Sequence, residues 1–532
     1  MITLTIDGKK ARVGEDANLV DAAAEVGVEI PTYCYHPGLS VVGQCRICFV
    51  EVEGMPRLVT ACSTPAQDGM VVQTDSERVR EARAAVMEFL LENHPLDCPV
   101  CDQAGECGLQ DYSVEHGLDS THMVDERRRF PGFERRLIGP HVVQNQNRCI
   151  HCTRCIRFAT EIAETADLTM KSRGNHSYID TFDGAPLDNP WSACVADVCP
   201  VGALTVREFR FRARVWHLEE TESLCPGCSV GCNIHLGHLD SAVHRFVPRS
   251  NPDVNGWWMC DYGRFLADGL NRREIEVPLR RFEDAEQAVT WDEALAELAS
   301  TLRKARRPLV VASANLSNEA LFSVKRNLLE GSRFDVVVPV HRGEDRRVKN
   351  ARREWMVGGD AHPNSAGAAH MGLATADGAD LESYLRDGDG PLLILDADAH
   401  PWLATEAAAA ATSGRWVAVL ARNRTPLVDS AGLVLPATSW AETEGTYTSS
   451  IGRLQMVQLA RQALSPRGLA RPAWEAVYRL AVHLGIEQER DVSPRILFAE
   501  MAAEIAAYQG MTYGRLLTDP GIAIHGEAAD VG

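Results

Sequence analysis

Fifteen of the sixteen cysteines in this 532-residue chain form four groups between residues 34 and 260. Their spacing is typical of the ligands of iron–sulfur clusters, and each cluster requires four protein ligands. The first group follows the pattern C-x10-C-x2-C-x13-C and consists of Cys34, Cys45, Cys48 and Cys62. Three thiolates on one loop, completed by a fourth from a neighbouring segment, predict a 2Fe-2S cluster. A zinc site and buried structural thiols are the alternatives.

The second group contains Cys98, Cys101 and Cys107 in the string NHPLDCPVCDQAGECGLQ. His94 precedes them and is a candidate fourth ligand, because imidazole binds either iron or zinc. The type of ligand alone does not decide between these metals. A surface histidine or a hydrogen-bonded core histidine is the alternative for His94.

The third group predicts one 4Fe-4S cluster and consists of Cys149, Cys152, Cys155 and Cys199. Two-cluster ferredoxins carry two such sets, and the last cysteine of each run binds the other cluster. In this chain the positions needed for the second cluster hold Ala159, Asn189, Ser192 and Val195. Cys194 is one position out of register, so we predict a packed or weakly exposed thiol.

The string HPLDCPVCDQAGECGLQD, preceded by CYHPGLSVVGQCRICFVEVEG and followed by RCIHCTRCIRF, closely resembles the large iron–sulfur subunit (75 kDa-type) of NADH:quinone oxidoreductase, respiratory complex I. In that family the histidine binds one iron of a 4Fe-4S cluster, so the resemblance implies this role for His94. Keeping only one of two ferredoxin clusters also resembles the complex I subunit more than its formate dehydrogenase relatives.

The fourth group resembles the 4Fe-4S site that opens the molybdopterin oxidoreductases, with zinc as the alternative, and consists of Cys225, Cys228, Cys232 and Cys260. The strings at 289–295, 364–372 and 433–455 extend this resemblance. Catalytic relatives carry a lysine where this chain has Tyr262, and no cysteine follows Cys260. Only 77 residues follow Gln455, so we expect a shortened C-terminal region without pterin.

The segments that must position these residues are predicted from periodicity. Residues 1–13 and 47–60 alternate apolar and polar side chains as strands do, with a hairpin turn at Asp7-Gly8. Beyond Cys260, residues 292–304 have helical spacing. Short apolar runs predict buried parallel strands at 307–314, 390–398 and 415–421. Helical segments, LSNEALFSVKRNLLEG and LATEAAAAATSG, lie between them and predict a doubly wound α/β region.

The expected fold is therefore multi-domain, α+β followed by α/β. The expected parts are a 2Fe-2S ferredoxin-like β-grasp domain (1–78), a helical His/Cys-ligated 4Fe-4S domain (79–139), a 4Fe-4S ferredoxin-like domain (140–215), a molybdopterin-oxidoreductase-type 4Fe-4S domain (216–280) and a truncated α/β domain (281–532).

Composition and charge exclude several other classes. The net charge of −19 argues against nucleic acid, and the basic stretch 126–136 predicts a connector or a docking edge for an acidic partner. No apolar run approaches the roughly 20 residues that span a bilayer. The chain begins as a strand without a signal peptide, so we expect a cytoplasmic protein that meets the membrane only through partners. No G-x-G-x-x-G motif joins a strand to a helix, because Gly388-Asp389-Gly390 precedes its strand.

The resemblance implies an electron-relay subunit without catalytic residues of its own. Its clusters would be one 2Fe-2S and three 4Fe-4S, and its partners an NADH-binding flavoprotein, a small 2Fe-2S subunit and quinone-facing hydrophilic subunits. Electrons would pass from NADH towards quinone. The alternatives are a relay subunit of an NAD-linked hydrogenase or formate dehydrogenase, a molybdopterin enzyme in its own right, and a structural scaffold.

Overall fold

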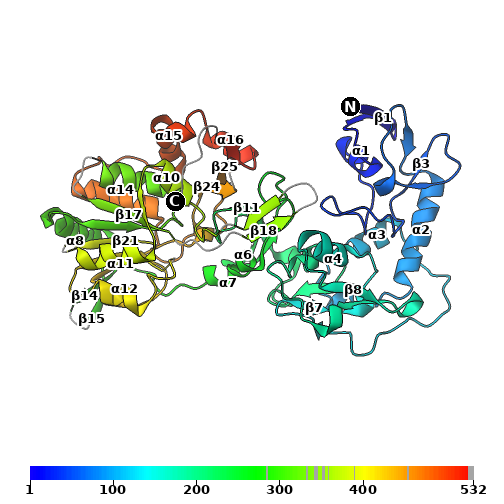
Figure 1. Cartoon of the computed structure of the whole chain (residues 1–532), viewed down its shortest axis with the longest axis horizontal. Coiled ribbons are helices and arrows are strands. Elements are labelled where there is room, and N and C mark those ends of the chain that lie inside the picture. The colour runs from blue at the N-terminus through cyan, green and yellow to red at the C-terminus, as the bar shows by residue number, and fades with distance from the viewer. Residues whose placement is uncertain are drawn as a thin grey trace. The chain divides into compact units, whose positions relative to one another are not determined.

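The chain forms two compact units in the computed structural model (Figure 1). The first runs from Met1 to His217 and includes 348–354; the second holds Leu218–Arg347 and the chain from Trp355 onward. The structure describes residues 1–524 except 283–284, 331–333, 341–345, 350–353, 358, 389, 399 and 452–453. Asp389 of the Gly388-Asp389-Gly390 string therefore lies outside the described residues.

The first unit begins with a five-stranded sheet of order β2-β1-β5-β3-β4. Its strands are β1 (Ile2–Ile6), β2 (Lys9–Val13), β3 (Phe49–Val52), β4 (Val59–Thr60) and β5 (Val71–Gln73). Asp7 and Gly8 both have positive φ, 46° and 80°, as the predicted hairpin turn requires. Helix α1 (Leu19–Glu25) begins with a capping box of Asn18 and Asp21. The predicted strands and hairpin are confirmed.

Two helices follow the sheet, α2 (Glu77–Leu91) and α3 (Gly108–His116), and the loop between them carries the second cysteine group. The rest of the unit is ferredoxin-like. Its elements are β6 (Arg136–Leu137), β7 (Val142–Gln144), α4 (Arg154–Arg157), η4 (Phe158–Ile162), β8 (Leu168–Lys171), β9 (Tyr178–Thr181), α5 (Cys194–Asp197) and β10 (Leu204–Val206). Element η4 is a π-turn that continues α4. Cys194 is fully buried, which confirms the interpretation as a packed thiol.

The second unit begins with an antiparallel sheet of β11 (Glu219–Leu224), β12 (Asn233–Leu239) and β13 (Ala242–Pro248). Two short helices follow, α6 (Asp261–Phe265) and α7 (Ala267–Leu270). This small region carries the fourth cysteine group.

An eight-stranded sheet of order β15-β14-β23-β22-β21-β16-β17-β20 dominates the second unit. Its strands are β14 (Leu279–Phe282), β15 (Ala285–Ala288), β16 (Leu309–Ala312), β17 (Asp335–Pro339), β20 (Ala374–Ala376), β21 (Leu392–Leu395), β22 (Val417–Ala421) and β23 (Leu433–Pro436). The six strands from β20 to β23 in this order are parallel. The chain moves outward from β16 to β20 and then restarts beside β16 with β21, so the strand order reverses between β16 and β21. The predicted doubly wound region is confirmed.

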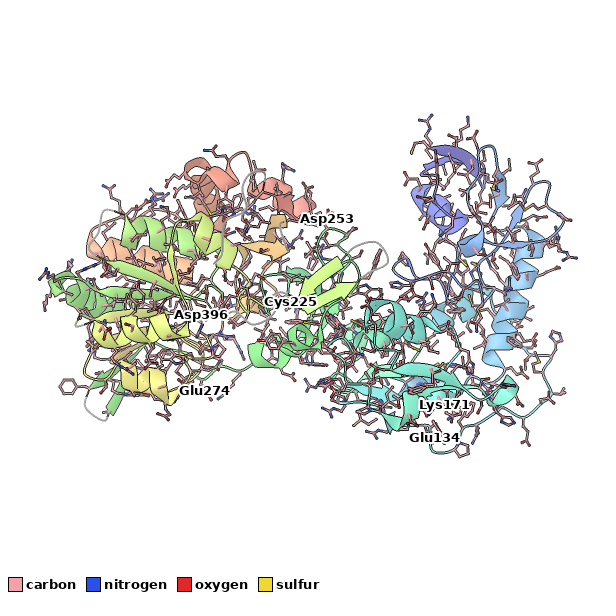
Figure 2. The ribbon with its side chains drawn as sticks, viewed as in Figure 1. Glu134, Lys171, Cys225, Asp253, Glu274 and Asp396 are labelled. Atoms are coloured by element: carbon pink, nitrogen blue, oxygen red, sulfur yellow. The ribbon has the colours of Figure 1, made fainter. Side chains whose placement is uncertain are left out.

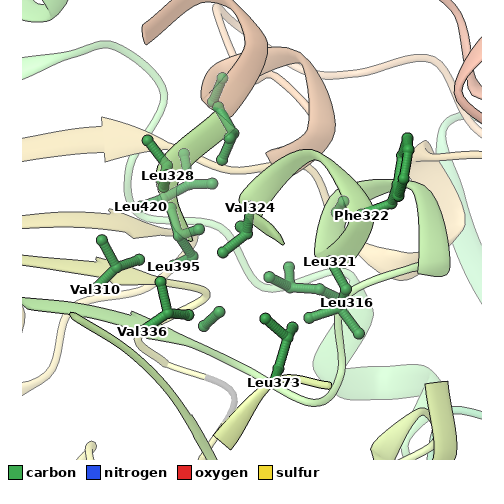
Figure 3. Close-up of a cluster of buried hydrophobic side chains, with 14 of the residues drawn as sticks. Val310, Leu316, Leu321, Phe322, Val324, Leu328, Val336, Leu373, Leu395 and Leu420 are labelled. Atoms are coloured by element: carbon green, nitrogen blue, oxygen red, sulfur yellow. The ribbon is translucent and has the colours of Figure 1, made fainter. Parts of the chain in front are cut away.

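Helices cover both faces of this sheet. They are α8 (Trp291–Lys304), α9 (Asn318–Val324) with the π-turn η8 (Lys325–Leu329), α10 (Ser365–His370), α11 (Gly378–Asp387), α12 (Glu406–Ala411), α13 (Pro426–Ser430) and α14 (Ala473–Leu484). Figure 1 shows α10 and α14 on one face and α11 and α12 on the other. Strand β16 alternates between the two cores, with Val310 facing one and Val311 the other. Figure 3 shows the first of these cores, where Val310 and Leu395 from the strands meet Leu321 and Val324 from α9.

The chain closes the unit with α15 (Pro494–Glu504), α16 (Tyr513–Thr518) and a sheet of β24 (Gly445–Ile451), β25 (Leu454–Ala460) and β26 (Ile522–Ala523). Strands β18 (Arg346–Lys349) and β19 (Glu354–Val357) lie in a stretch of which only part is described. Among the described helices, none combines the length and hydropathy needed to cross a bilayer.

Candidate metal centres

The four cysteines of the first group converge between the loop that precedes β3 and the turn that follows β4. The backbone N–H of Cys34 donates to Sγ of Cys45 at 3.5 Å, and the N–H of Cys45 donates to Sγ of Cys34 at 3.4 Å. The thiol of Cys48 lies 3.5 Å from that of Cys62. Hydrogen bonds from the Cys45 and Cys62 thiols lower the pKa of Cys34. The four thiols thus lie together, and this arrangement fits two bridged irons with two thiolates each.

The second group lies on the loop between α2 and α3, where Cys107 caps the start of α3. Cys101 and Cys107 are buried, and burial raises the pKa of both thiols. The His94 side chain is half-buried, and its buried Nδ1 atom has no hydrogen-bond partner among the described groups. Burial lowers the pKa of His94 to about 4, so the ring is neutral at pH 7. A neutral imidazole whose buried Nδ1 atom is unpartnered, four residues before Cys98 in the chain, fits a metal ligand.

The third group lines a cavity together with apolar side chains such as Ile179 and Leu204. All four of its cysteines face this cavity: Cys149, Cys152, Cys155 and Cys199. Burial raises the pKa of Cys149 to about 12 and that of Cys152 to about 11. These two thiols are therefore protonated at neutral pH, and metal binding has to displace their protons. An apolar cavity with four converging thiols fits a 4Fe-4S cluster.

The backbone around the third group is unusual because two residues with side chains, His151 and Thr153, have φ of 54° and 60°. Left-handed backbone at such residues is uncommon and is found where the surrounding structure imposes it. The two turns place Cys149, Cys152 and Cys155 around one cavity although they are only three residues apart in the chain.

Buried arginines connect these ligand loops. Nη2 of Arg157 donates to the carbonyl of Cys34 at 2.5 Å and to that of Cys152 at 3.3 Å. Arg148, which precedes Cys149, forms an ion pair with Asp97 at 2.6 Å, and Asp97 precedes Cys98. These residues join the first loop to the third and the third loop to the second. The sequence interpretation did not assign these arginines a role, although they alternate with the cysteines in RCIHCTRCIRF.

Close backbone packing also joins the second and third groups. A Cβ atom on Gly202 would lie 2.3 Å from Sγ of Cys101, so only glycine permits this approach. Tyr33 makes a longer connection from the first loop, because its hydroxyl donates to the carbonyl of Gly108 at 3.2 Å. Tyr33 precedes Cys34, and Gly108 follows Cys107.

The fourth group lies in the second unit, where the end of β11 lies beside the start of β12. Leu224 pairs with Asn233 in this hairpin, and the N–H of Cys225 donates to the carbonyl of Cys232 at 2.8 Å. Sγ of Cys260 accepts the N–H of Gly263 at 3.4 Å at the start of α6. A Cβ atom on Gly263 would lie 2.5 Å from Sγ of Cys225. Besides burial, the negative charges of the Cys228 and Cys260 thiolates raise the pKa of Cys225, and those of the other three cysteines raise the pKa of Cys232. The four cysteines therefore lie together and fit one cluster.

Within the described residues, no three His, Cys, Asp or Glu side chains close around a point that a single metal ion could occupy. A 4Fe-4S cluster binds each of its four ligands at a different iron, so its ligand set surrounds a larger body than one ion.

A second cavity, of about 250 Å³, opens at the carboxyl ends of the parallel strands where the strand order reverses. Ligand crevices of doubly wound sheets form at this position. Asn315 after β16, Asp396 and Asp398 after β21, and Arg422 after β22 line it, and Tyr262 contributes from α6. Figure 2 labels Asp396 and Cys225 within this unit.

The lining does not fit a molybdopterin dinucleotide, whose pyrophosphate is anionic. Among the described lining residues, Arg422 is the one side chain with a permanent positive charge, and Asp398 already pairs with it at 3.6 Å. Asp396 is half-buried, and desolvation raises its pKa to about 6. An excess of carboxylates in this lining repels phosphate.

Five family models match the chain in an order that agrees with these centres. They are a 2Fe-2S iron–sulfur cluster binding domain (1–77), the NADH-ubiquinone oxidoreductase-G iron–sulfur binding region (83–122), the ferredoxin-like domain of NADH-quinone oxidoreductase subunit 3 (139–205), the molybdopterin oxidoreductase Fe4S4 domain (218–272) and molybdopterin oxidoreductase (402–482). Fold and sites together define a multi-cluster iron–sulfur protein with a molybdopterin-oxidoreductase-like region.

Three similar proteins indicate which iron–sulfur proteins this chain resembles. The 78 kDa subunit of mitochondrial NADH-ubiquinone oxidoreductase from Candida albicans is 43% identical over 330 residues, which are 61% of this chain and 45% of the relative. The Neurospora crassa 78 kDa subunit is 46% identical over 300 residues, which are 56% of this chain and 40% of the relative. The 75 kDa subunit of NADH-ubiquinone oxidoreductase from Reclinomonas americana is 42% identical over 304 residues, which are 57% of this chain and 44% of the relative.

The matched part of this chain is homologous to the large iron–sulfur subunit of NADH:quinone oxidoreductase, and it spans less than half the length of these relatives. Among solved structures, a chain of the NAD⁺-reducing [NiFe]-hydrogenase in the H₂-reduced state is 30% identical, with 40% of this chain and 91% of that chain covered and a TM-score of 0.37.

Proposed function

We propose that this chain is an iron–sulfur electron-relay subunit of an NADH:quinone oxidoreductase. The proposed cofactors are one 2Fe-2S cluster, bound by the first group, and three 4Fe-4S clusters, bound by His94 with the second group and by the third and fourth groups. These clusters supply reversible one-electron transfer, while the protein sets their potentials through ligand type, hydrogen bonds and burial.

The observation that carries this proposal is the network of buried connections between three ligand loops in one unit. Arg157 contacts the carbonyls of two proposed ligands, Cys34 and Cys152. Arg148 and Gly202 bring the third loop against the second. Tyr33 offers a direct but longer link from the first loop to the second. We infer that electrons pass from the first centre to the third and then to the second, a route that does not follow the order of the groups in the chain.

The proposed partners follow from the relatives. An NADH-binding flavoprotein would donate electrons with a small 2Fe-2S subunit, and quinone-facing hydrophilic subunits would accept them. The complex would lie at the cytoplasmic face of the inner membrane, with this chain as a peripheral subunit. The five-part division proposed for the chain, with boundaries near 78, 139, 215 and 280, is supported by the bounds of the family models.

The test is anaerobic reduction of the protein alone and in its purified complex, followed by electron paramagnetic resonance. The isolated chain should be reduced by dithionite but not by NADH, whereas NADH should reduce its centres within the complex. Reduction by hydrogen or formate in place of NADH would favour the hydrogenase or formate dehydrogenase relay. Centres that stay oxidised in a complex that turns over would favour a structural scaffold and contradict the proposal.

A further inference from the structure

Arg157 lies where the two ferredoxin-like parts of the first unit meet. One nitrogen of its guanidinium, Nη2, donates to the carbonyl oxygens of both Cys34 and Cys152, and Nη1 donates to the carbonyl of Ser40. The side chain is 7% exposed, so water hardly competes for these hydrogen bonds. A single nitrogen atom therefore links the backbones of two proposed ligands that belong to different centres.

Helix α4 presents this side chain. Cys155 and Arg157 lie two positions apart on the helix, which continues as the π-turn η4, and π-turns are frequent at functional sites. Arg154 on the same helix donates to the carbonyls of Tyr35 and Val198, which are neighbours of proposed ligands but not ligands themselves. Arg157 is thus the member of this arginine pair that contacts the proposed ligands directly.

The charge of Arg157 matters as much as its geometry. A cluster with four thiolates is anionic, and reduction makes it more so. A guanidinium remains protonated at any pH at which the protein is folded. Buried charges interact more strongly than exposed ones because the local dielectric constant is lower. Arg157 therefore lowers the electrostatic cost of an added electron at both neighbouring centres.

We propose that Arg157 is the positioning residue for electron transfer between the first and third centres, holding their ligand loops together and providing a hydrogen-bonded path between them. This proposal rests on the proposed relay function. One electron leaves the first centre and one enters the third; no bond is formed or broken, and the guanidinium keeps its proton. In the complex the electron would come from a reduced flavoprotein. In the test it comes from a reduced flavin, which a flash generates when the photoexcited flavin oxidises a sacrificial amine donor present in excess.

The test uses two substitutions in the cluster-loaded full chain. Arg157→Lys keeps the charge but cannot reproduce the planar fork, and Arg157→Met removes both charge and donors. The matched control is Glu161→Gln, because Glu161 binds the N–H of Ser40 at 2.9 Å and so joins the same two loops without contacting a proposed ligand. Iron content, the midpoint potential of each centre and the rate of electron transfer after a flash are measured for each protein.

Arg157→Lys should slow transfer from the first centre to the third roughly tenfold, as loss of groups that hydrogen-bond around metal ligands commonly does, with midpoint potentials near those of the wild type. Arg157→Met should slow transfer as much and also lower both potentials. Glu161→Gln should behave as the wild type. If the Arg157→Met protein loses iron, the transfer rate of the iron-replete Arg157→Lys protein tests the proposal by itself.

Wild-type transfer rates in an iron-replete Arg157→Lys protein would overturn the role of Arg157. Failure of the wild type itself to pass electrons between these two centres would instead overturn the proposed relay. The two failures are therefore distinguishable within one experiment.

Discussion

At the scale of single residues, the buried Nδ1 atom of His94 is one of several buried polar side-chain atoms that have no hydrogen-bond partner in the described part of the chain. Buried polar atoms in native proteins are nearly always hydrogen-bonded, so an exception calls for an explanation. Coordination of a metal would satisfy this atom. The depressed pKa agrees, since a ligating imidazole must be neutral.

His94→Cys should lower the midpoint potential of the second centre. The substitution keeps four ligands but replaces a neutral imidazole with an anionic thiolate, and in Rieske centres the opposite exchange raises the potential. A redox titration followed by electron paramagnetic resonance, at matched iron content, measures the shift. The control is His122→Asn, because His122 is exposed and pairs with Glu88. Unchanged potentials and spectra for every centre in His94→Cys would show that His94 is only a neighbour.

At the scale of secondary-structure elements, helix α9 and strand β24 are joined by a buried carboxyl group. Glu319 is completely buried and accepts hydrogen bonds from the N–H of Thr446 at 2.9 Å and from its hydroxyl at 2.9 Å. Burial nevertheless raises the pKa of Glu319 to about 7 from an ordinary value of 4.5. The protonated form is thus favoured in the folded state.

The free energy of unfolding of the second unit should therefore fall as pH rises. A carboxyl whose pKa is raised in the folded state contributes its full stability below the unfolded pKa of about 4.5 and loses it as pH passes through about 7. Glu319→Gln should remove roughly 3 kcal/mol of this dependence between pH 4 and pH 8. Urea unfolding of the full chain, followed by tryptophan fluorescence, measures it, because eight of the ten tryptophans belong to the second unit.

Some pH dependence should remain in Glu319→Gln, because burial also raises the pKa of Asp396, to about 6. The matched control is Glu293→Gln, since Glu293 caps α8 from an exposed position and its pKa is lowered by the N–H of Thr290. Glu293→Gln should not reduce the fall of the free energy of unfolding with rising pH. An equal slope in the wild type and Glu319→Gln would contradict the assignment.

At the scale of the whole molecule, three proposed centres belong to the first unit and the fourth to the second. The buried arginines and close packing described above lie within the first unit. The fourth adjoins a cavity whose acidic lining does not fit a pterin. We therefore expect the fourth centre to be a structural side branch.

Cys228→Ala should reduce the iron content from roughly fourteen to roughly ten per chain, as expected when one of three 4Fe-4S clusters is lost. The second unit should become less stable because metal binding contributes folding free energy. Elemental analysis, with no molybdenum or zinc expected, and protease resistance of the second unit provide the measurements. Electron transfer through the first unit should survive. An assembled Cys228→Ala complex that no longer passes electrons from NADH would refute the side branch.

The sequence by itself predicted the ligand sets, which remain a proposal, and determined most of the secondary structure, because both predictions use spacing along the chain. In each group three cysteines lie close together in the chain, although Cys199 and Cys260 lie farther along it. The predicted helix at 292–304 and strand at 415–421 agree with α8 and β22. The division of the chain beyond Cys260 into alternating strands and helices followed from the same periodicity.

Only the tertiary structure decided how the centres connect. Arg157 meets Cys34 across 123 positions of the chain, and Arg148 meets Asp97 across 51. Periodicity carries no information about such pairs, because they depend on how separately formed loops pack. The same holds for Gly202, whose missing side chain is needed only because Cys101 lies against it. The acidic cavity likewise exists only where β16 and β21 become neighbours, since its lining residues come from strands that are far apart in the chain.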